Sequence, residues 1–287
     1  MIPMQGLLKH HYGFVIWLVL AAVMLCGLAW LGWHEVHKPI HTQQLSAKAR
    51  LGEQVFHDTT LSASGQQSCA SCHLKEFGHA SARGLEIGGS QMQFSGDRNT
   101  PSLRYLWRNT GLQFDEEGKA SGGFFWDGRS DSLNAQAAEP FLNPAEMANA
   151  DKASVVAKLS RTAYAAEFER VFGKDIWQQT DKAFAGMTQA LASYQTEVTD
   201  FHPFDSLFDR AAQGQASFTA AQQRGWELFK DPEKGNCAAC HTAEADKDGT
   251  PALFTDNSYD NLGVPVSSKM LKHQALDQGV CTHPLVR

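Results

Sequence analysis

The chain has 287 residues, with 25 Lys and Arg against 31 Asp and Glu, so its formal net charge is −6. This length allows one large or two ordinary domains, and 43% hydrophobic with 20% charged residues excludes wholesale disorder. The slight acidity argues against a nucleic-acid partner, because such a protein needs a basic face to neutralise phosphates. The 6 cysteines are too few for a disulfide-stapled miniprotein.

The first expected element is an apolar segment near the N-terminus. Residues 12–33 contain no charged side chain, and as a helix they would extend about 33 Å, enough to cross a hydrocarbon core. A cleaved secretory signal and a buried core helix are the alternatives, but the segment is longer than a usual signal and ends in bulky residues. We therefore predict a cytoplasmic N-terminus at 1–11, a transmembrane anchor at 12–33 and a linker at 34–45. The rest of the chain would lie in the bacterial periplasm, making a single-pass inner-membrane protein.

After the linker, apolar residues recur at helical spacing and no run alternates between apolar and polar residues, so a mainly α protein is expected. A first helix is predicted at 46–56. The loop-rich stretch at 58–128 is long for an unsupported loop, which indicates that a cofactor or a function organises it. Further helices are predicted with Asp151 and Thr180 as capping residues and from Thr219 onward. Their expected apolar positions are Val155, Val156, Leu159 and Tyr164, then Phe184, Met187, Leu191 and Tyr194, and then Trp226, Leu228 and Phe229.

A short motif occurs twice, each time after an expected helix with an aromatic residue near its end. The copies are Cys69-Ala70-Ser71-Cys72-His73 and Cys237-Ala238-Ala239-Cys240-His241. Cys-x-x-Cys-His is the attachment motif of c-type haem, in which the thiols bond the haem vinyl groups and the His binds the iron. A thioredoxin-like site would need a βαβ setting, and a zinc site would need more ligands at close spacing. We therefore predict two covalent c-type haems on Cys69, Cys72, Cys237 and Cys240, with His73 and His241 as iron ligands.

Further motifs surround these two copies in a characteristic order. They are Leu61-Ser62-Ala63-Ser64-Gly65, Arg98-Asn99-Thr100-Pro101-Ser102-Leu103, Phe125-Trp126-Asp127-Gly128-Arg129, Gln136, Pro140, Asn143-Pro144-Ala145-Glu146-Met147, Phe254-Thr255-Asp256-Asn257-Ser258 and Asn261-Leu262-Gly263-Val264-Pro265. This pattern closely resembles the bacterial di-haem cytochrome c peroxidase/MauG family, from about Leu51 to the C-terminus. The resemblance implies two cytochrome c-like haem domains, which we place at 46–204 and 205–287.

The resemblance also implies roles for individual residues. The haem on His73 would be the peroxidatic one, and the haem on His241 would accept electrons. Gln136 and Glu146 match the Gln and Glu of the distal pocket, and Trp126 matches the Trp between the haems. Asn99 matches a residue at a calcium site between the haems, so calcium is a candidate third cofactor.

The chemistry of peroxide cleavage supports the roles of Glu146 and Gln136 independently of the resemblance. Cleaving the O–O bond needs a base that takes a proton from one oxygen and returns it to the other, which a carboxylate such as Glu146 can do. Gln136 could hold the peroxide by hydrogen bonding. Structural alternatives remain: Glu146 as a helix cap, Gln136 as a surface helix residue and Trp126 as a core residue.

The sequence departs from classical members of this family at two points. Those members carry a distal ligand His in an Ile-Gly-His setting, where this chain reads Glu86-Ile87-Gly88-Gly89. His79 lies only six residues after His73 and is a less suitable ligand. The first haem therefore resembles that of the MauG-like branch, with an open iron position. The second departure is the segment after His241, which lacks a recognisable sixth ligand; Met270, His273 and His283 are weak candidates.

The function expected from these observations is reduction of hydrogen peroxide to water by a di-haem peroxidase. Its electron donor would be a small redox protein, such as cytochrome c or a cupredoxin, or a quinol. A MauG-like enzyme that oxidises a protein substrate through high-valent haem is the first alternative, and a non-enzymatic di-haem electron carrier is the second. The domain at 205–287 is expected to be incomplete at its C-terminal side. Homodimer formation is left as an open alternative.

Overall fold

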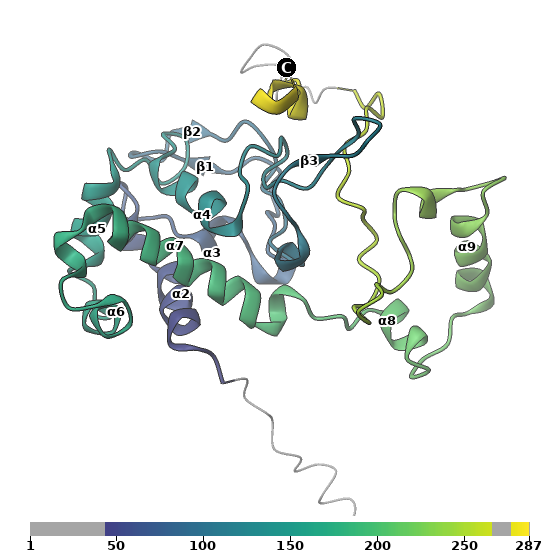
Figure 1. Ribbon diagram of the computed structural model, residues 1–287, viewed down its shortest axis with the longest axis horizontal. Helices are drawn as coiled ribbons and strands as arrows, with labels where there is room; N and C mark the ends of the chain where they lie inside the picture. The colour runs from purple at the N-terminus through teal and green to yellow at the C-terminus, as the bar shows by residue number, and fades with distance from the viewer. Residues whose placement is uncertain (1–43, 266–276, 287) are drawn as a thin grey trace, which may run out of the picture. The chain divides into compact units, whose positions relative to one another are not determined.

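The computed structural model describes residues 44–265 and 277–286 (Figure 1). In chain order its helices are α2 Ala47–His57, α3 Cys69–Cys72, α4 Leu133–Leu142, α5 Lys152–Leu159, α6 Ala165–Phe172, α7 Thr180–Glu197, α8 Leu207–Ala212 and α9 Ala220–Lys230. Two short antiparallel ribbons pair β1 Ile87–Gly88 with β2 Phe94–Ser95, and β3 Gln113–Phe114 with β4 Ala120–Ser121. The prediction of a mainly α protein is confirmed.

The predicted localisation needs a correction. No helix within residues 44–265 and 277–286 is long and apolar enough to cross a membrane. The expected anchor at 12–33, with the N-terminus at 1–11, lies outside the described residues. The assignment as a single-pass inner-membrane protein is therefore not kept.

The core of the first module, which is the domain predicted at 46–204, is built on the packing of α2 against α7. The Ser46 side chain caps α2 by accepting a hydrogen bond from the Ala49 amide. The crossing is close, because a Cβ on Gly52 would lie 2.0 Å from the Ala190 carbonyl oxygen. The largest fully buried side chains of this core are Phe56, Phe141, Phe168, Phe201, Leu51, Leu61, Leu159, Met187 and Leu191.

The helices that complete this core begin and end slightly differently from the expectation. Asp151 caps α5 through the Ser154 amide, as predicted, but α5 ends at Leu159 and Tyr164 lies just before α6. Thr180 is the first residue of α7, and Gln179 precedes it without a side-chain capping bond. The buried face of α7 carries the expected residues Phe184, Met187, Leu191 and Tyr194.

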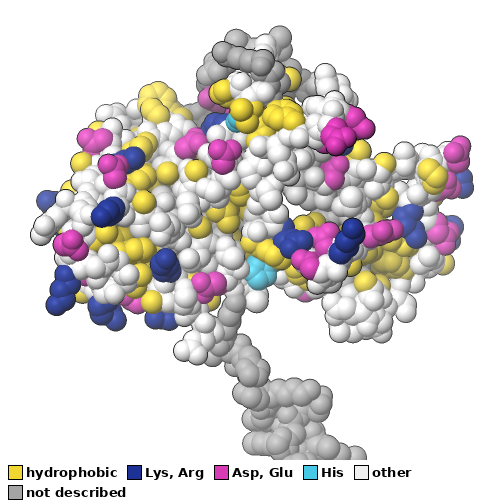
Figure 2. Space-filling view, viewed as in Figure 1, with side chains coloured by type: hydrophobic (Ala, Val, Ile, Leu, Met, Phe, Trp, Pro, Cys, Tyr) yellow, Lys and Arg dark blue, Asp and Glu magenta, His cyan; other side chains and the backbone are white. Residues whose placement is uncertain are grey.

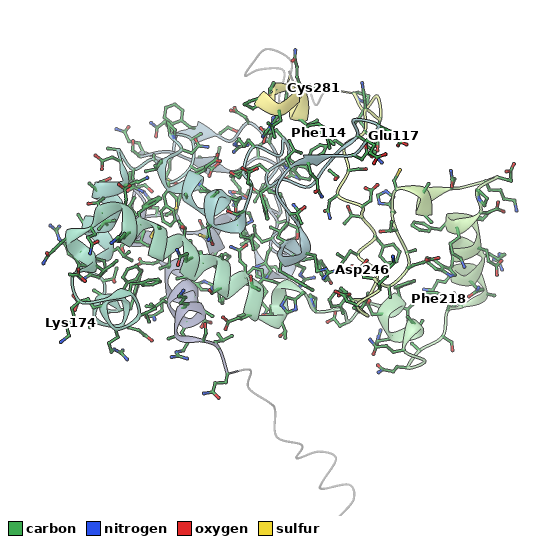
Figure 3. The ribbon with its side chains drawn as sticks, in the orientation of Figure 1. Phe114, Glu117, Lys174, Phe218, Asp246 and Cys281 are labelled. Carbon is green, nitrogen blue, oxygen red and sulfur yellow. The ribbon has the colours of Figure 1, made fainter. Side chains whose placement is uncertain are left out.

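The stretch from residue 58 to 128 is loop-rich, as expected, and is held by short 3-10 turns and the two ribbons. The turns within this stretch are Thr59–Leu61, Lys75–Phe77 and Leu106–Arg108. Two further 3-10 turns, Ile176–Gln178 and Thr199–Phe201, lie before and after α7. The labelled Phe114 and Glu117 belong to the β3–β4 hairpin (Figure 3). Helix α4, which the sequence did not predict, follows this stretch and packs on α7.

The part of the chain after residue 204 contains α8, α9 and 3-10 turns at Cys237–Ala239, Gly279–Thr282 and Pro284–Val286. The helix predicted from Thr219 onward is α9, and Thr219 is its capping residue. None of the residues of α9 is buried, and Leu228 is 49% exposed. Its aromatic side chains instead form an open cluster with rings from α8 and the following loop: Phe208, Trp226, Phe229 and Phe254. Hydrophobic side chains consequently reach the surface in this region (Figure 2).

Candidate functional site

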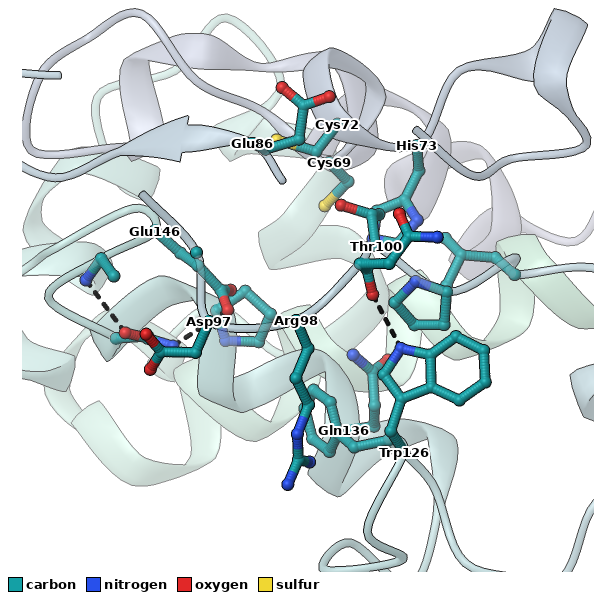
Figure 4. Close-up of a pocket in the computed structure, with 18 of the residues that line it drawn as sticks. Cys69, Cys72, His73, Glu86, Asp97, Arg98, Thr100, Trp126, Gln136 and Glu146 are labelled. Carbon is teal, nitrogen blue, oxygen red and sulfur yellow. Dashed lines mark hydrogen bonds between the residues drawn. The ribbon is translucent and has the colours of Figure 1, made fainter. Parts of the chain in front are cut away.

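A cavity of about 650 Å³ lies next to the first Cys-x-x-Cys-His motif. It brings together seven of the sequence-predicted site residues: Cys69, Cys72, His73, Asn99, Trp126, Gln136 and Glu146. Figure 4 shows the motif on one side of this cavity, with Gln136 and Glu146 reaching into it from other elements. The residues that the resemblance assigned to one pocket are therefore neighbours in space.

The motif side of the cavity has the geometry that an iron ligand needs. Helix α3 begins at Cys69, and the His73 amide bonds the Cys69 carbonyl at 2.8 Å, which places both thiols and the imidazole on one short turn. The His73 Nδ1 hydrogen-bonds the His79 carbonyl oxygen at 2.9 Å, so that Nε2 is the nitrogen left for a metal. Burial lowers the pKa of His73 to about 4 and raises the pKa of Cys69 to about 12. The imidazole is consequently neutral, which is the form that binds a metal.

The opposite wall carries the candidate acid–base groups. Gln136 is on α4 and only 8% exposed, which excludes its interpretation as a surface helix residue. Glu146 lies in the turn after α4 rather than at the start of a helix, and its Oε1 accepts a hydrogen bond of 2.9 Å from Asn143 Nδ2. Burial raises the pKa of Glu146, while Arg129 and Asn143 act in the opposite direction. Asn143 is thus a site residue that sequence reasoning quoted in a motif but did not single out.

A chain of ion pairs borders the same cavity and was also missed at the sequence level. Arg98 contacts Asp127 at 2.7 Å and Asp277 at 2.6 Å. Asp127 contacts Arg129 at 3.0 Å, and Arg129 contacts Glu139 at 2.8 Å. Arg129 also lies over the Phe125 ring, 3.6 Å from its centroid. The signal was present in the Phe-Trp-Asp-Gly-Arg motif, whose charged residues received no role.

Trp126 and Asn99 contact each other at the edge of the cavity. The Trp126 indole N–H donates to the Asn99 carbonyl oxygen at 2.7 Å (Figure 4). Trp126 is 53% exposed, so its interpretation as a plain core residue is wrong. Within the described residues, no group of three or more His, Cys, Asp or Glu side chains could hold a metal ion, and the calcium site at Asn99 stays a prediction.

The position at which classical members carry a ligand His is Gly89, and its backbone conformation disfavours a side chain. Gly88 and Gly89 are both buried, and a Cβ on Gly88 would lie 2.1 Å from the Ala145 carbonyl oxygen. Gly89 has a φ of +92°, and its Cβ would lie 2.6 Å from a ring carbon of Phe94. The ring of His79 does not line the cavity, because it stacks on Phe201 at 4.1 Å. Neither residue 89 nor His79 therefore provides a distal ligand in this conformation.

The second motif repeats the local geometry of the first one in a more exposed setting. The His241 amide bonds the Cys237 carbonyl at 2.9 Å, and His241 Nδ1 bonds the Phe254 carbonyl at 2.9 Å. Cys237, Cys240 and His241 are all exposed. The loop that follows is tied to the first module by Arg108, which contacts Asp246 and Asp248 at 2.6 and 2.8 Å; Asp246 is labelled in Figure 3.

Candidates for the second motif's sixth ligand are only partly described. Met270 and His273 lie outside the described residues. His283 is described, and its Nδ1 accepts a hydrogen bond from the Leu285 amide at 3.2 Å. The sixth ligand consequently stays open.

The first cavity fits a covalently bound haem. Its volume falls within the roughly 300–1,000 Å³ that cofactor pockets occupy. Its wall combines the two thiols and a neutral imidazole with apolar side chains that suit a porphyrin face: Phe56, Leu103, Ala137, Pro140, Met147 and Leu191. The donor set at the second motif is the same, although its surroundings are open.

Known proteins resemble this chain in sequence and structure. Residues 46–217 match the family described as di-haem cytochrome c peroxidase. The methylamine utilization protein MauG of Paracoccus denitrificans is 38% identical over 246 residues, covering 84% of this chain and 62% of that protein. The cytochrome c peroxidase Ccp of Escherichia coli is 34% identical over 68% of this chain and 37% of that protein.

Solved structures agree with the sequence comparison. The diheme peroxidase BthA from Burkholderia thailandensis matches with a TM-score of 0.75 and 31% identity, covering 84% of this chain and 61% of that one. The chain therefore spans about three fifths of the length of these two relatives, MauG and BthA. The family implies two c-type haems, in agreement with the two motifs. With the matched region, the cavity and the fold all in accord, the chain belongs to the di-haem cytochrome c peroxidase family.

Proposed function

We propose that this protein is a peroxidase that reduces hydrogen peroxide to water with electrons from a small redox protein or a quinol. The reaction consumes one peroxide, two electrons and two protons and yields two water molecules. The observation that supports it most directly is the opposition of His73 to Gln136 and Glu146 across one cavity. Cys69 and Cys72 would anchor the first haem, and Cys237, Cys240 and His241 would bind the second.

Each side chain of the cavity has a distinct task in this proposal. A c-type haem held by Cys69, Cys72 and His73 would supply the redox-active iron that peroxide reduction needs. Glu146 takes a proton from one peroxide oxygen and returns it to the other, a role for which a raised pKa is suited. Gln136 orients the peroxide by donating from its amide.

The second module would receive electrons and pass them to the first. Its exposed His241 and cysteines suit contact with a donor protein, because a haem held there would lie near the surface. Trp126, at the cavity edge, is the candidate relay between the haems. The contacts of Arg108 with Asp246 and Asp248 support electron transfer from the second module to the first, because they hold the loop after the second motif against the first module.

A MauG-like oxidation of a protein substrate is the second candidate function. It is favoured by Gly89, which offers no ligand side chain and whose φ of +92° disfavours one, and by the 38% identity to a MauG protein. Both functions would need an iron that peroxide can reach, and they differ in the source of electrons: a small redox protein or a quinol in one case, a protein substrate in the other.

Three measurements on the holoprotein test these proposals. Electron paramagnetic resonance of the oxidised protein separates a peroxide-reacting enzyme from an electron carrier, because the carrier would show only six-coordinate, low-spin haems. Peroxide-dependent oxidation of reduced cytochrome c at enzymatic rates would support the peroxidase. Rapid reaction with peroxide but no turnover with cytochrome c, a cupredoxin or a quinol would instead favour the MauG-like function.

A further inference from the structure

The glycine turn that replaces the classical ligand position lies against the turn that carries Glu146. The Gly89 amide donates a hydrogen bond of 2.8 Å to the Glu146 carbonyl oxygen. One residue earlier, Gly88 lies so close to the Ala145 carbonyl that a Cβ would approach its oxygen to 2.1 Å. The backbone at Gly88 and Gly89 is therefore in direct contact with the backbone at Ala145 and Glu146, and a side chain at position 88 would separate the two segments.

The other side of the Glu146 turn is fixed by the end of α4. The Glu146 amide bonds the Asn143 carbonyl at 3.0 Å, and the Met147 amide bonds the Pro140 carbonyl at 3.1 Å. The Asn143 side chain additionally holds the Glu146 carboxylate at 2.9 Å. The Glu146 backbone is thus held between α4 on one side and the glycine turn on the other.

The glycine turn is itself anchored independently of Glu146. Gly88 pairs with Phe94 in the β1–β2 ribbon. The Ile87 carbonyl accepts a hydrogen bond of 3.2 Å from Gln67 Nε2, and Gln67 is only two residues before Cys69. A path of direct contacts therefore connects the haem-attachment segment, the glycine turn and the candidate acid–base residue.

We infer that Gly88 and Gly89 are positioning residues that set the location of the Glu146 carboxylate above the peroxide site. Gly89 takes the place of the classical ligand, and the lack of a side chain on Gly88 allows the turn to approach the Glu146 backbone closely enough for the bond from the Gly89 amide. This inference rests on the proposed role of Glu146 and adds a cause for its placement.

The structure gives the size of the expected effect. An Ala at position 88 needs roughly 1 Å more space than the 2.1 Å available to its Cβ, so the Ala145–Glu146 peptide must move by about that distance. Misplacement of a catalytic group by about 1 Å costs on the order of 10²-fold in rate. We therefore expect Gly88→Ala to slow the reaction of the holoprotein with peroxide by about 10²-fold, with both haems retained.

A double-mutant cycle with Glu146→Gln tests whether this effect passes through Glu146. The inference predicts that Gly88→Ala has little further effect once Glu146 is replaced, because the displaced group is already inactive. Equal effects of Gly88→Ala in both backgrounds would overturn it, as would a wild-type rate in the single variant. If Glu146→Gln alone leaves the rate unchanged, the proposed role of Glu146 fails, which is a distinct outcome. Gly225→Ala is the matched control, since its Cβ would meet nothing within 4 Å.

A measurement on the unmodified holoprotein covers the case in which Gly88→Ala does not fold. Hydrogen exchange followed by mass spectrometry should show a protected amide at Gly89, because it donates to the Glu146 carbonyl and is buried. Exchange of this amide at the rate of an open loop would overturn the inference.

Discussion

Replacing Glu146 by Gln tests the chemistry of the first cavity most directly. The substitution keeps the side-chain length and leaves an oxygen that can accept the bond from Asn143, but it removes the group that takes up a proton. General acid–base catalysis contributes roughly 10²–10⁴-fold, which equals about 2.7–5.5 kcal/mol of transition-state stabilisation. We expect the rate constant for the peroxide reaction, measured by stopped-flow absorbance, to fall by that factor with haem content unchanged.

The pH dependence of the same rate provides an internal check. Only the ionised carboxylate accepts a proton, so the rate should fall as the pH drops through the pKa of Glu146. Burial raises that pKa above the ordinary glutamate value, so the loss should occur at a less acidic pH than for an exposed carboxylate. Glu146→Gln should abolish this acid limb. Glu169→Gln is a suitable control, because Glu169 is half-buried and accepts a bond from Trp177 outside the cavity. Near-normal kinetics in Glu146→Gln would refute the reasoning.

Three further predictions follow from the cavity and the motifs. The holoprotein should carry two covalent haems by mass spectrometry, and replacing both cysteines of the first motif with Ala should remove one; retention of both would contradict the attachment site. The oxidised resting protein should show a high-spin ferric signal from the haem on His73, because the turn at 88–89 offers no ligand side chain; two low-spin signals alone would contradict this. Arg129→Gln should shift the acid limb of the peroxide reaction to higher pH, because Arg129 lowers the pKa of Glu146, whereas Arg129→Lys should largely restore it; an unshifted profile in Arg129→Gln would show that this charge does not act on Glu146.

The sequence predicted those features that depend on local pattern. The helix at 46–56 and the buried face of α7 follow from apolar residues at helical spacing. Asp151 caps its helix through a bond to the Ser154 amide, as predicted. The two Cys-x-x-Cys-His motifs require fixed spacing, so their geometry is also local.

Features that depend on contacts between distant segments were not predictable in the same way. Helix α4 contains a Pro and has no clear amphipathic pattern in the sequence, and it forms because Ser132 caps it and α7 covers it. The ion pair between Arg98 and Asp277 joins residues 179 positions apart. The resemblance placed Gln136 and Glu146 in one pocket, but only the structure shows that Asn143 and the glycine turn hold Glu146 in place.

The two Cys-x-x-Cys-His motifs have the same local geometry but different proposed functions. In both copies the imidazole Nδ1 is bonded to a backbone carbonyl at 2.9 Å, so the orientation of the iron ligand is set by nearby backbone. The surroundings differ: the first motif borders a cavity between α4 and the loop-rich stretch, whereas the second is exposed. Peroxide chemistry needs an enclosed site with a positioned base, and electron transfer from a partner needs a haem close to the surface. The division of labour that we propose therefore follows from what encloses each motif, since the motifs themselves are nearly equivalent.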